Sequence, residues 1–398
     1  MLILRLAWAD MIRDRFFLFC NAAVMVGILV PLLVLFGVKN GVYTALIGEM
    51  LADPANLQID TAGNVTLSEA DIAPLRDWPE IAFLTPKVRG QFDYVNLRPV
   101  DGRRIRAALM VPTGAGDPTL PDGAMLAEGE VAVSAQLAEQ LELQAGDAVQ
   151  LITQAEDRPR QLVLDKRIGL VLDPGATSGR AVLAPFETLS LIEAFYDSYS
   201  LPEYGIEGSR ELAERVPAYA GLRIYAHRLE DLSALQSRVE SELGLGTTAN
   251  TRAVDSLLGL GRKLNMALAG TAVLAALGLG AALVLGFWSD VARKRGVLAG
   301  IALIGVPSRQ LALFPVIQAG LTACIGLILS FAIFLVAGQG AEALFGQGLP
   351  GAAPLVLLQP GQALAIAVAV LVLVVVAAGA AAWSALRLDP ASVLREAA

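Results

Sequence analysis

Few residues in this sequence have the types and spacing that catalysis or metal binding requires. His227 is the single histidine, and both cysteines, Cys20 and Cys324, fall in apolar stretches. No cluster of His and Cys ligands is therefore available for zinc or iron, and we interpret His227 as a surface or packing residue rather than a ligand or a catalyst. No Gly-x-Ser-x-Gly sequence is present to serve as a nucleophile elbow. We expect no catalytic residue, no metal ligand and no bound cofactor.

The sequence also lacks the phosphate-binding loop of many nucleotide-hydrolysing proteins. That loop, G-x-x-x-x-G-K-[ST], needs a Gly-Lys pair, because its backbone N–H groups and its lysine hold the phosphates together. No Gly-Lys pair occurs in the 398 residues. Any ATP-driven work would therefore need a partner subunit that binds the ATP and Mg²⁺.

One segment, 289–310, has a pattern typical of protein docking. It carries a basic cluster from Arg293 to Arg295 and continues through an apolar, helix-like stretch to Arg309. One interpretation is a positively charged flank followed by an extension of the next helix. The other, which we favour, is a short helix whose apolar side docks into another protein, because an exposed apolar patch of this size indicates a partner. The residues expected at the contact are Arg293, Lys294, Arg295, Val297, Leu298, Ile301, Leu303, Ile304 and Gly305.

The elements around that segment are four long apolar stretches. Hydrophobic residues make up 55% and charged residues 17% of the sequence, and the mean hydropathy is +0.58. These values exclude a soluble enzyme, a disordered chain and a basic nucleic-acid binder. A membrane-spanning helix needs about 20 mostly apolar residues, and the stretches that qualify are 16–38, 264–288, 311–337 and 362–386. None of the four contains a charged residue, which disfavours a proton-coupled transporter.

Three glycines in the second stretch, Gly270, Gly278 and Gly286, recur every eight residues on one helix face. Small residues let membrane helices approach closely, so we interpret them as packing positions within the chain or in a dimer. A substrate path along these glycines is the alternative.

The distribution of basic residues predicts the orientation of the four helices. Cytoplasmic flanks of membrane helices are enriched in Lys and Arg. Such residues occur in segments 1–15, 289–310 and 387–398, whereas loop 338–361 has none. We therefore expect both termini and 289–310 on the cytoplasmic side, with loop 338–361 and residues 39–263 on the outer side. Segment 1–15 is expected to form an interfacial helix.

Residues 39–263 are predicted to form a large acidic domain with two subdomains. They hold 21 Lys/Arg and 32 Asp/Glu, a net charge of −11. The predicted elements at its two ends are strands 56–60, 81–86 and 222–226 and helices 67–77 and 229–243. We expect these to pack together as one mixed α/β unit. Between them, 92–215 is rich in short strand-like runs separated by Gly, Pro and Asp turns, with a single helix at Ser134–Glu142. This region is predicted to be a β-rich subdomain.

Several motifs follow one another in a recognisable order. Residues 67–72 and 78–81 read L-S-E-A-D-I and W-P-E-I, and residues 130–134 and 141–147 read E-V-A-V-S and L-E-L-Q-A-G-D. Segment 301–305 reads I-A-L-I-G, and the tail carries D-P-x-x-x-L-R in the form of Asp389, Pro390, Leu394 and Arg395. Together with the order of one span, a large outer domain and three spans, these motifs resemble the ABC-transporter permeases of the MacB, LolC/LolE and FtsX type. The acidic residue usual after the basic pair is absent, as is the arginine of the family's Leu-Arg-Ala-Leu-Gly element.

The resemblance implies a multi-pass permease subunit in the bacterial cytoplasmic membrane, with a MacB-like core domain in the periplasm. Two permease chains, identical or related, would pair with two copies of a separate ABC-type ATPase. ATP binding there would push segment 296–306 and tilt the second span, and the motion would reach the outer domain through stalk-like extensions near 42–51 and 251–263. The work would be export or extraction of an amphipathic or lipid-linked substrate. A periplasmic adaptor, a lipoprotein or a hydrolase is the further partner that such systems use.

Two other functions are consistent with the same sequence. One is an FtsX-like signal transmitter whose outer domain activates a cell-wall hydrolase without moving a substrate. The other is a membrane-tethered binding or assembly protein that works without an ATPase. The size of the outer domain favours transport.

Overall fold

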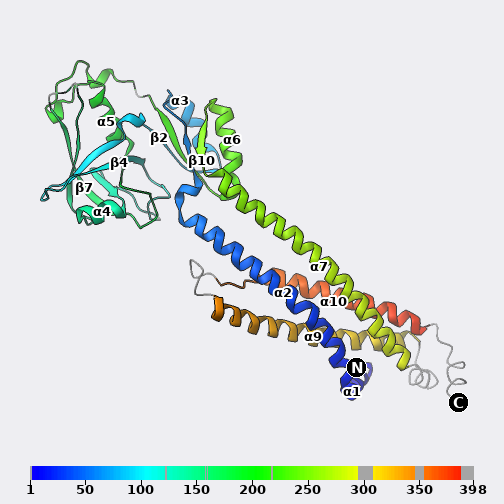
Figure 1. The fold of residues 1–398 in the computed structure, drawn as a ribbon. Helices are drawn as coiled ribbons and strands as arrows, with labels where there is room; N and C mark the ends of the chain where they lie inside the picture. Colours follow the sequence, from blue (N-terminus) through cyan, green and yellow to red (C-terminus); the bar gives the residue numbers. More distant parts are fainter. Residues whose placement is uncertain are drawn as a thin grey trace, which may run out of the picture. The chain divides into compact units, whose positions relative to one another are not determined.

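The protein divides into two compact units in a computed structural model that describes residues 2–294, 308–345 and 354–386, apart from residues 122, 157, 159 and 217. One unit comprises residues 1–47 and 260–398, and the other comprises residues 48–259. The first unit is helical and the second is a mixed α/β region (Figure 1).

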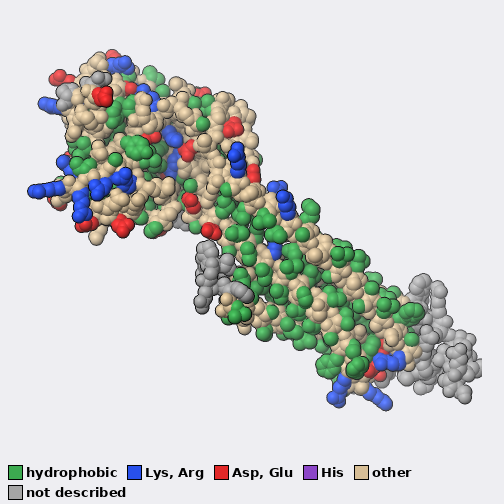
Figure 2. Space-filling model, viewed as in Figure 1, with side chains coloured by type: hydrophobic (Ala, Val, Ile, Leu, Met, Phe, Trp, Pro, Cys, Tyr) green, Lys and Arg blue, Asp and Glu red, His purple; other side chains and the backbone are tan. Residues whose placement is uncertain are grey.

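The helical unit contains four helices that are long and apolar enough to cross a membrane. Its helices are α1 (Leu2–Arg13), α2 (Arg15–Ala52), α7 (Thr251–Arg293), α9 (Ser308–Phe345) and α10 (Pro360–Leu386). All except α1 are spanning candidates, and each contains one of the four stretches predicted from the sequence. Helices α2, α7 and α9 extend well beyond those stretches, and residues 42–51 and 251–263 are helical. Hydrophobic side chains cover most of the visible surface of these helices in Figure 2.

The four long helices share one apolar core. Met25 of α2, Leu283 of α7 and Val374 of α10 are fully buried in it. Helices α9 and α10 contribute mainly alanines to the same core, which allows close helix approach. A Cβ at Gly326 of α9 would lie 2.8 Å from the sulfur of Met25, so the glycine lets α9 approach Met25 of α2 closely.

The three glycines of α7 differ in what they face. A Cβ at Gly286 would lie 2.9 Å from Oδ1 of Asn21 in α2, so this position packs within the chain as expected. No described atom lies within 4 Å of a Cβ built at Gly270 or Gly278. Of these three glycines, only Gly286 packs against described residues of the same chain, and packing of Gly270 and Gly278 in a dimer stays a prediction.

Two other glycines, Gly37 and Gly41 of α2, lie in close contact with the segment that precedes α10. The N–H of Leu357 donates to the carbonyl of Gly37 at 2.9 Å. A Cβ at Gly41 would overlap the carbonyl oxygen of Leu355. Because α9 continues to Phe345, residues 338–345 are helical, and the predicted loop 338–361 starts later than expected.

The mixed α/β region begins and ends in a four-stranded sheet of order β10-β1-β9-β2. Its strands are β1 (Gln58–Thr61), β2 (Ile81–Lys87), β9 (Gly221–Ala226) and β10 (Thr247–Ala249), and helix α6 (Leu232–Leu243) follows β9. Every residue of β9 is buried, and β9 pairs antiparallel with both β1 and β2. The strands predicted at the two ends of this region therefore meet in one sheet.

The predicted helix over 67–77 is shorter than expected. Helix α3 (Glu69–Ile72) is one α-helical turn, and Ala73–Asp77 continues as a 3-10 helix. Pro74 lacks the N–H that an α-helix would use at that point, which explains the change. Ser68 and Asp71 form a capping box at the N-terminus of this turn, in which the N–H of Ser68 donates to Oδ2 of Asp71 at 2.8 Å.

Between β2 and β9 the chain forms a closed barrel of order β3-β4-β8-β5-β7-β6. The strands are β3 (Tyr94–Pro99), β4 (Arg106–Thr113), β5 (Glu130–Val133), β6 (Ala148–Thr153), β7 (Leu162–Val171) and β8 (Ala181–Pro185). The barrel core includes Leu97, Val133 and Ile168, all fully buried. Closure leaves no free strand edge.

Two helices accompany the barrel strands, whereas the sequence predicted one. Helix α4 (Ala135–Leu141) matches the prediction, and α5 (Phe186–Tyr196) was missed. Residues 186–196 contain aromatic residues and threonine, which favour strands. Tertiary packing decides the outcome, because Leu189, Ile192 and Phe195 lie on the buried side of α5. The remaining short 3-10 helices are Pro54–Leu57, Gly90–Phe92, Pro202–Tyr204, Leu212–Glu214 and Leu229–Asp231.

A buried ion pair joins the sheet to the end of barrel strand β4. Nη1 of Arg223 in β9 lies 2.5 Å from Oδ2 of Asp117 and donates to the carbonyl of Pro112 at 2.9 Å. The side chains of Arg223 and Asp117 are only 4% and 0% exposed. Asp117 also accepts hydrogen bonds from Thr113 and Thr119. A buried pair of this kind needs such additional partners to offset desolvation.

Candidate functional site

The predicted docking segment is described only at its start. Arg293 ends α7 and Lys294 follows it. The other predicted contact residues, Arg295, Val297, Leu298, Ile301, Leu303, Ile304 and Gly305, lie outside the described residues. The tail motif of Asp389, Pro390, Leu394 and Arg395 also lies outside them.

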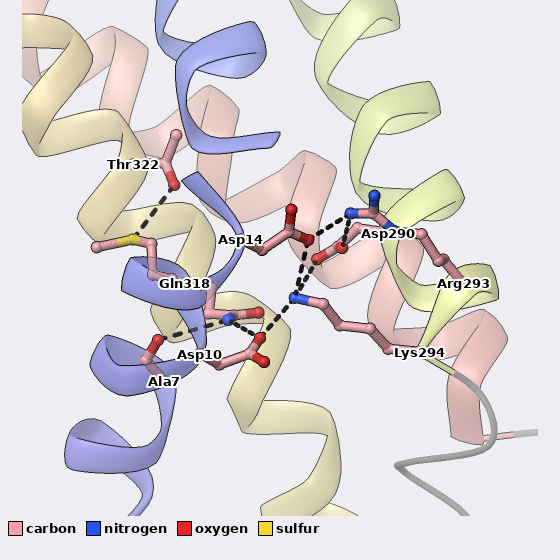
Figure 3. A network of polar contacts seen from close by, with 9 residues as sticks. Ala7, Asp10, Asp14, Asp290, Arg293, Lys294, Gln318 and Thr322 are labelled. Atoms are coloured by element: carbon pink, nitrogen blue, oxygen red, sulfur yellow. Dashed lines mark hydrogen bonds and ion pairs between the residues drawn. The ribbon is translucent and has the colours of Figure 1, made fainter. Parts of the chain in front are cut away.

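Arg293 and Lys294 belong to a polar network that joins the end of α7 to α1 (Figure 3). Nη2 of Arg293 lies 2.6 Å from Oδ2 of Asp14 and 3.0 Å from Oδ1 of Asp290. Nζ of Lys294 lies 2.6 Å from Oδ2 of Asp10, 3.3 Å from Oδ2 of Asp290 and 4.0 Å from Oδ2 of Asp14. Two cations from the end of α7 are thus held among three carboxylates.

Helix α9 joins the same network. Nε2 of Gln318 donates to Oδ2 of Asp10 at 2.8 Å, the oxygen that also binds Lys294. One turn further along α9, Thr322 Oγ1 contacts the sulfur of Met11 at 3.9 Å. The network therefore fixes α1 against α9 and the end of α7 (Figure 3).

The local sequence explains why these side chains converge. Helix α1 ends at Arg13 and α2 begins at Arg15, so Asp14 is the turn between them. The N–H of Asp14 still donates to the carbonyl of Asp10 at 2.9 Å. Residues four apart lie on one helix face, and the two carboxylates therefore present a paired acidic surface to α7. On α7, Asp290 is three residues before Arg293 and four before Lys294, so all three side chains share a face.

The network favours the ionised form of Asp10. Partial burial acts to raise the pKa of Asp10, but hydrogen bonds from Lys294 and Gln318 and the nearby charges of Lys294 and Arg13 outweigh it, and the pKa lies below its usual value. The side chain of Lys294 is 17% exposed and that of Asp290 is 10% exposed. The guanidinium of Arg293 also lies over the ring of Phe17, 5.1 Å from its centroid.

The network is an interhelical joint and not a ligand pocket. The space that Asp14, Asp290, Lys294 and Gln318 help to enclose is only about 20 Å³. That volume is close to the space of one water molecule. Among the described residues, no group of three or more His, Cys, Asp or Glu side chains has an arrangement that could hold a metal ion.

His227 lies just beyond the end of β9 and is exposed. Its backbone N–H donates to the carbonyl of Glu80 at 2.9 Å. The placement is consistent with the surface interpretation made from the sequence.

Sequence reasoning singled out Arg293 and Lys294 but missed their partners Asp10, Asp14, Asp290 and Gln318. A signal was present in the spacing, because Asp10 and Asp14 are four apart and Asp290 precedes the basic cluster by three and four residues. What the sequence could not supply is the pairing, since Asp10 and Lys294 are 284 positions apart.

Comparison of the sequence with protein-family models finds no matching family, and comparison with curated proteins finds no significant match. Support for a function therefore comes from the residues and their geometry.

Proposed function

We propose that this chain is the permease subunit of an ABC transporter, which couples ATP hydrolysis on a separate ATPase to mechanical work on an amphipathic or lipid-linked substrate outside the cytoplasm. In this proposal the four long helices cross the bacterial cytoplasmic membrane. Both termini and segment 289–310 face the cytoplasm, and the region from 39 to 263 faces the periplasm.

The observation that carries the proposal is the network of Asp10, Asp14, Asp290, Arg293 and Lys294. These residues connect the start of the proposed docking segment to α1 and, through Gln318, to α9. A partner that pushes on residues 295–307 would therefore transmit force to more than one helix. A loop that only joined two membrane helices would have no need of a partly buried ionic joint at its entrance.

Helices α2 and α7 support a mechanical role as well. Each is a single helix, of 38 and 43 residues, although about 20 residues suffice to cross the hydrocarbon layer. The extra turns at 42–51 and 251–263 lie at the ends that lead into β1 and out of β10. They are the elements through which displacement of the helical unit would reach the mixed α/β region.

Capture of the ATPase tests the docking segment. The full chain, tagged and purified in detergent after co-expression with a candidate ABC-type ATPase subunit from the same bacterium, is expected to retain that ATPase. A Leu303→Glu variant is expected to lose it, because a carboxylate would have to be desolvated at an apolar contact. Val216→Glu is the matched control, since Val216 is 82% exposed in the other unit. Full retention of the ATPase by the Leu303→Glu variant would count against the docking segment.

Labelling from either side of the membrane tests the topology. In a chain whose Cys20 and Cys324 are replaced by alanine, single cysteines are introduced at Ser308 and at Ser209. A membrane-impermeant maleimide added to intact spheroplasts is expected to label position 209 and not position 308. Labelling of position 308 from outside would contradict the proposed orientation.

A further inference from the structure

The unit formed by residues 48–259 contains a cavity of about 350 Å³, within the size range of small-molecule sites. Strand β2, at the edge of the four-stranded sheet, lines it with Leu84, Thr85 and Pro86. The end of β4 and the first residues of α5 complete the wall. The cavity thus lies where the sheet meets the barrel, and junctions of this kind are common places for ligand sites.

Apolar and aromatic side chains form much of the wall. Met125 is 74% exposed and lines the cavity. Phe186 and Tyr219 pack edge to face, with ring centroids 5.3 Å apart. Leu84 lines the same space. These residues provide a platform for the apolar body of a ligand.

Two of the described residues that line the cavity are charged, and they differ in whether a residue of opposite charge pairs with them. Arg76 is paired with Glu69, with Nη1 and Oε1 2.6 Å apart, and the hydroxyl of Tyr219 also donates to Glu69 at 3.1 Å. Glu187, in the first turn of α5, is exposed and makes no ion pair or hydrogen bond with any side chain in the described part of the chain. The unneutralised charge at the cavity is therefore negative and lies next to an aromatic pair.

We propose that this cavity binds an amphipathic amine, a ligand with an apolar body and one ammonium group. The ammonium would lie between the carboxylate of Glu187 and the rings of Phe186 and Tyr219, since carboxylates and aromatic faces both attract cations. The apolar body would cover Met125 and Leu84. This inference goes beyond the proposed function, because binding at this site needs no ATPase and does not depend on the docking segment.

A matched pair of fluorescent probes tests the proposal on the full chain. Dansylcadaverine carries a primary ammonium, and its N-acetylated form has the same apolar body without the charge. Each probe is titrated onto the chain in lipid nanodiscs without ATPase, and the signal of empty nanodiscs is subtracted. We expect saturable binding of dansylcadaverine and about fivefold weaker binding of the acetylated probe, the effect of one exposed ion pair.

Three variants assign the binding to the cavity. Glu187→Gln is expected to lose most of the preference for dansylcadaverine and to keep only the part that the rings of Phe186 and Tyr219 supply. Glu203→Gln, which removes an exposed carboxylate that does not line the cavity, is expected to keep the fivefold preference. Ala115→Trp, at an exposed position of the cavity wall, is expected to abolish binding of both probes by filling the space.

The proposal is overturned by absence of saturable binding, by unchanged binding to the Ala115→Trp variant, or by a preference for the amine that is undiminished in the Glu187→Gln variant. It is also overturned if Glu203→Gln removes the preference as completely, because the effect would then come from the net charge of the surface. An unchanged thermal unfolding midpoint for each variant establishes that it is folded. Loss of ATPase capture would leave these outcomes unaffected.

Discussion

Lys294 is the last described residue before segment 295–307. Its ammonium lies 2.6 Å from a carboxylate oxygen of Asp10, which is near the N-terminus. That oxygen also accepts a hydrogen bond from Gln318 of α9. One atom therefore connects α1, α9 and the residue that leads out of α7. This contact ties all three elements to the start of the proposed docking segment.

The energetic link between Asp10 and Lys294 is the first quantity to measure. We expect Asp10→Asn and Lys294→Met each to lower the thermal unfolding midpoint of the full chain in detergent, and the double variant to be more stable than additivity predicts. The side chain of Asp10 is 35% exposed, so a coupling energy of about 0.5–1 kcal/mol is expected. The exposed pair Arg104 and Glu142, 62% and 75% exposed, is the control and should give no measurable coupling. Strict additivity at Asp10 and Lys294 would contradict the joint.

The same pair has a defined dependence on pH. The pKa of Asp10 lies below the ordinary value of 3.8, mainly because the hydrogen bonds from Lys294 and Gln318 outweigh partial burial. A carboxyl with a lowered pKa stabilises the folded state above its unfolded pKa, and this stability is lost as the pH falls through the lowered value. The coupling energy is therefore expected to be constant near neutral pH and to disappear well below pH 3.8. A coupling that fades between pH 5 and 7 would assign the effect to other groups.

Asp93 should produce the opposite dependence. Burial raises its pKa to about 6, with Lys87 acting against this shift and Glu193 adding to it. A carboxyl with a raised pKa loses stability as the pH rises from its unfolded value of 3.8 to about 6. We expect Asp93→Asn to be more stable than the parent at pH 7, by up to about 3 kcal/mol, and to equal it at pH 4. Thermal unfolding across this pH range measures the difference, with Asp101→Asn in an exposed turn as the control. A difference that does not change with pH would contradict the assignment.

Breaking the Arg223 and Asp117 pair should be among the most damaging single changes in residues 48–259. Asp117→Asn leaves a guanidinium buried without its counter-charge, and the expected loss is about 3–5 kcal/mol. The double variant Arg223→Met with Asp117→Leu removes both charges and is expected to recover much of that loss. Unfolding by heat, followed by circular dichroism, measures both variants. If the double variant is as unstable as Asp117→Asn, packing rather than charge controls this joint.

Gly41 is expected to tolerate no side chain. In a Gly41→Ala variant the new Cβ would overlap the carbonyl oxygen of Leu355, and overpacking of this kind typically lowers stability by about 1–3 kcal/mol. Gly27→Ala, in the same helix, is the matched control because a Cβ there meets no described atom within 4 Å. Thermal unfolding in detergent should separate the two variants, and equal midpoints would show that residues 354–357 do not need the close approach.

The helical part of the fold was predictable because the pattern that identifies it, a long uncharged apolar stretch, is local in the sequence. Uncharged stretches such as 16–38 and 362–386 identify their helices without any knowledge of what they contact. The ends of the helices were less predictable, since residues 42–51 and 251–263 carry mixed polarity and are helical in continuation of α2 and α7. In the mixed α/β region, β2 and β9 were predictable from short apolar runs, but closure of the barrel depends on pairings such as β4 with β8, which join distant segments.

The candidate site was predictable only in part, for the same reason. The basic residues Arg293 and Lys294 stand out as a cluster, and Asp10 and Asp14 stand out by their spacing. Their pairing is a tertiary contact that depends on the turn at Asp14 and on the packing of α1 against α9. Likewise, Gly37 and Gly41 could be recognised from the sequence as small residues one helical turn apart. Their contact with residues 354–357 could not be predicted, because it is a tertiary contact.

The barrel is inserted in the chain between two strands of the sheet, β2 and β9, and this order has a consequence for biosynthesis. Central strand β9 follows the barrel in the chain, so β1 and β2 emerge first and have no neighbour to pair with until residues 88–220 have been synthesised. Sequence-distant pairing of this kind slows folding, and unpaired strands are prone to aggregate in the interval. The barrel, which contains all of its own strand partners, can close first. Maturation of this region is therefore expected to be sequential, with completion of the sheet as its late and vulnerable step.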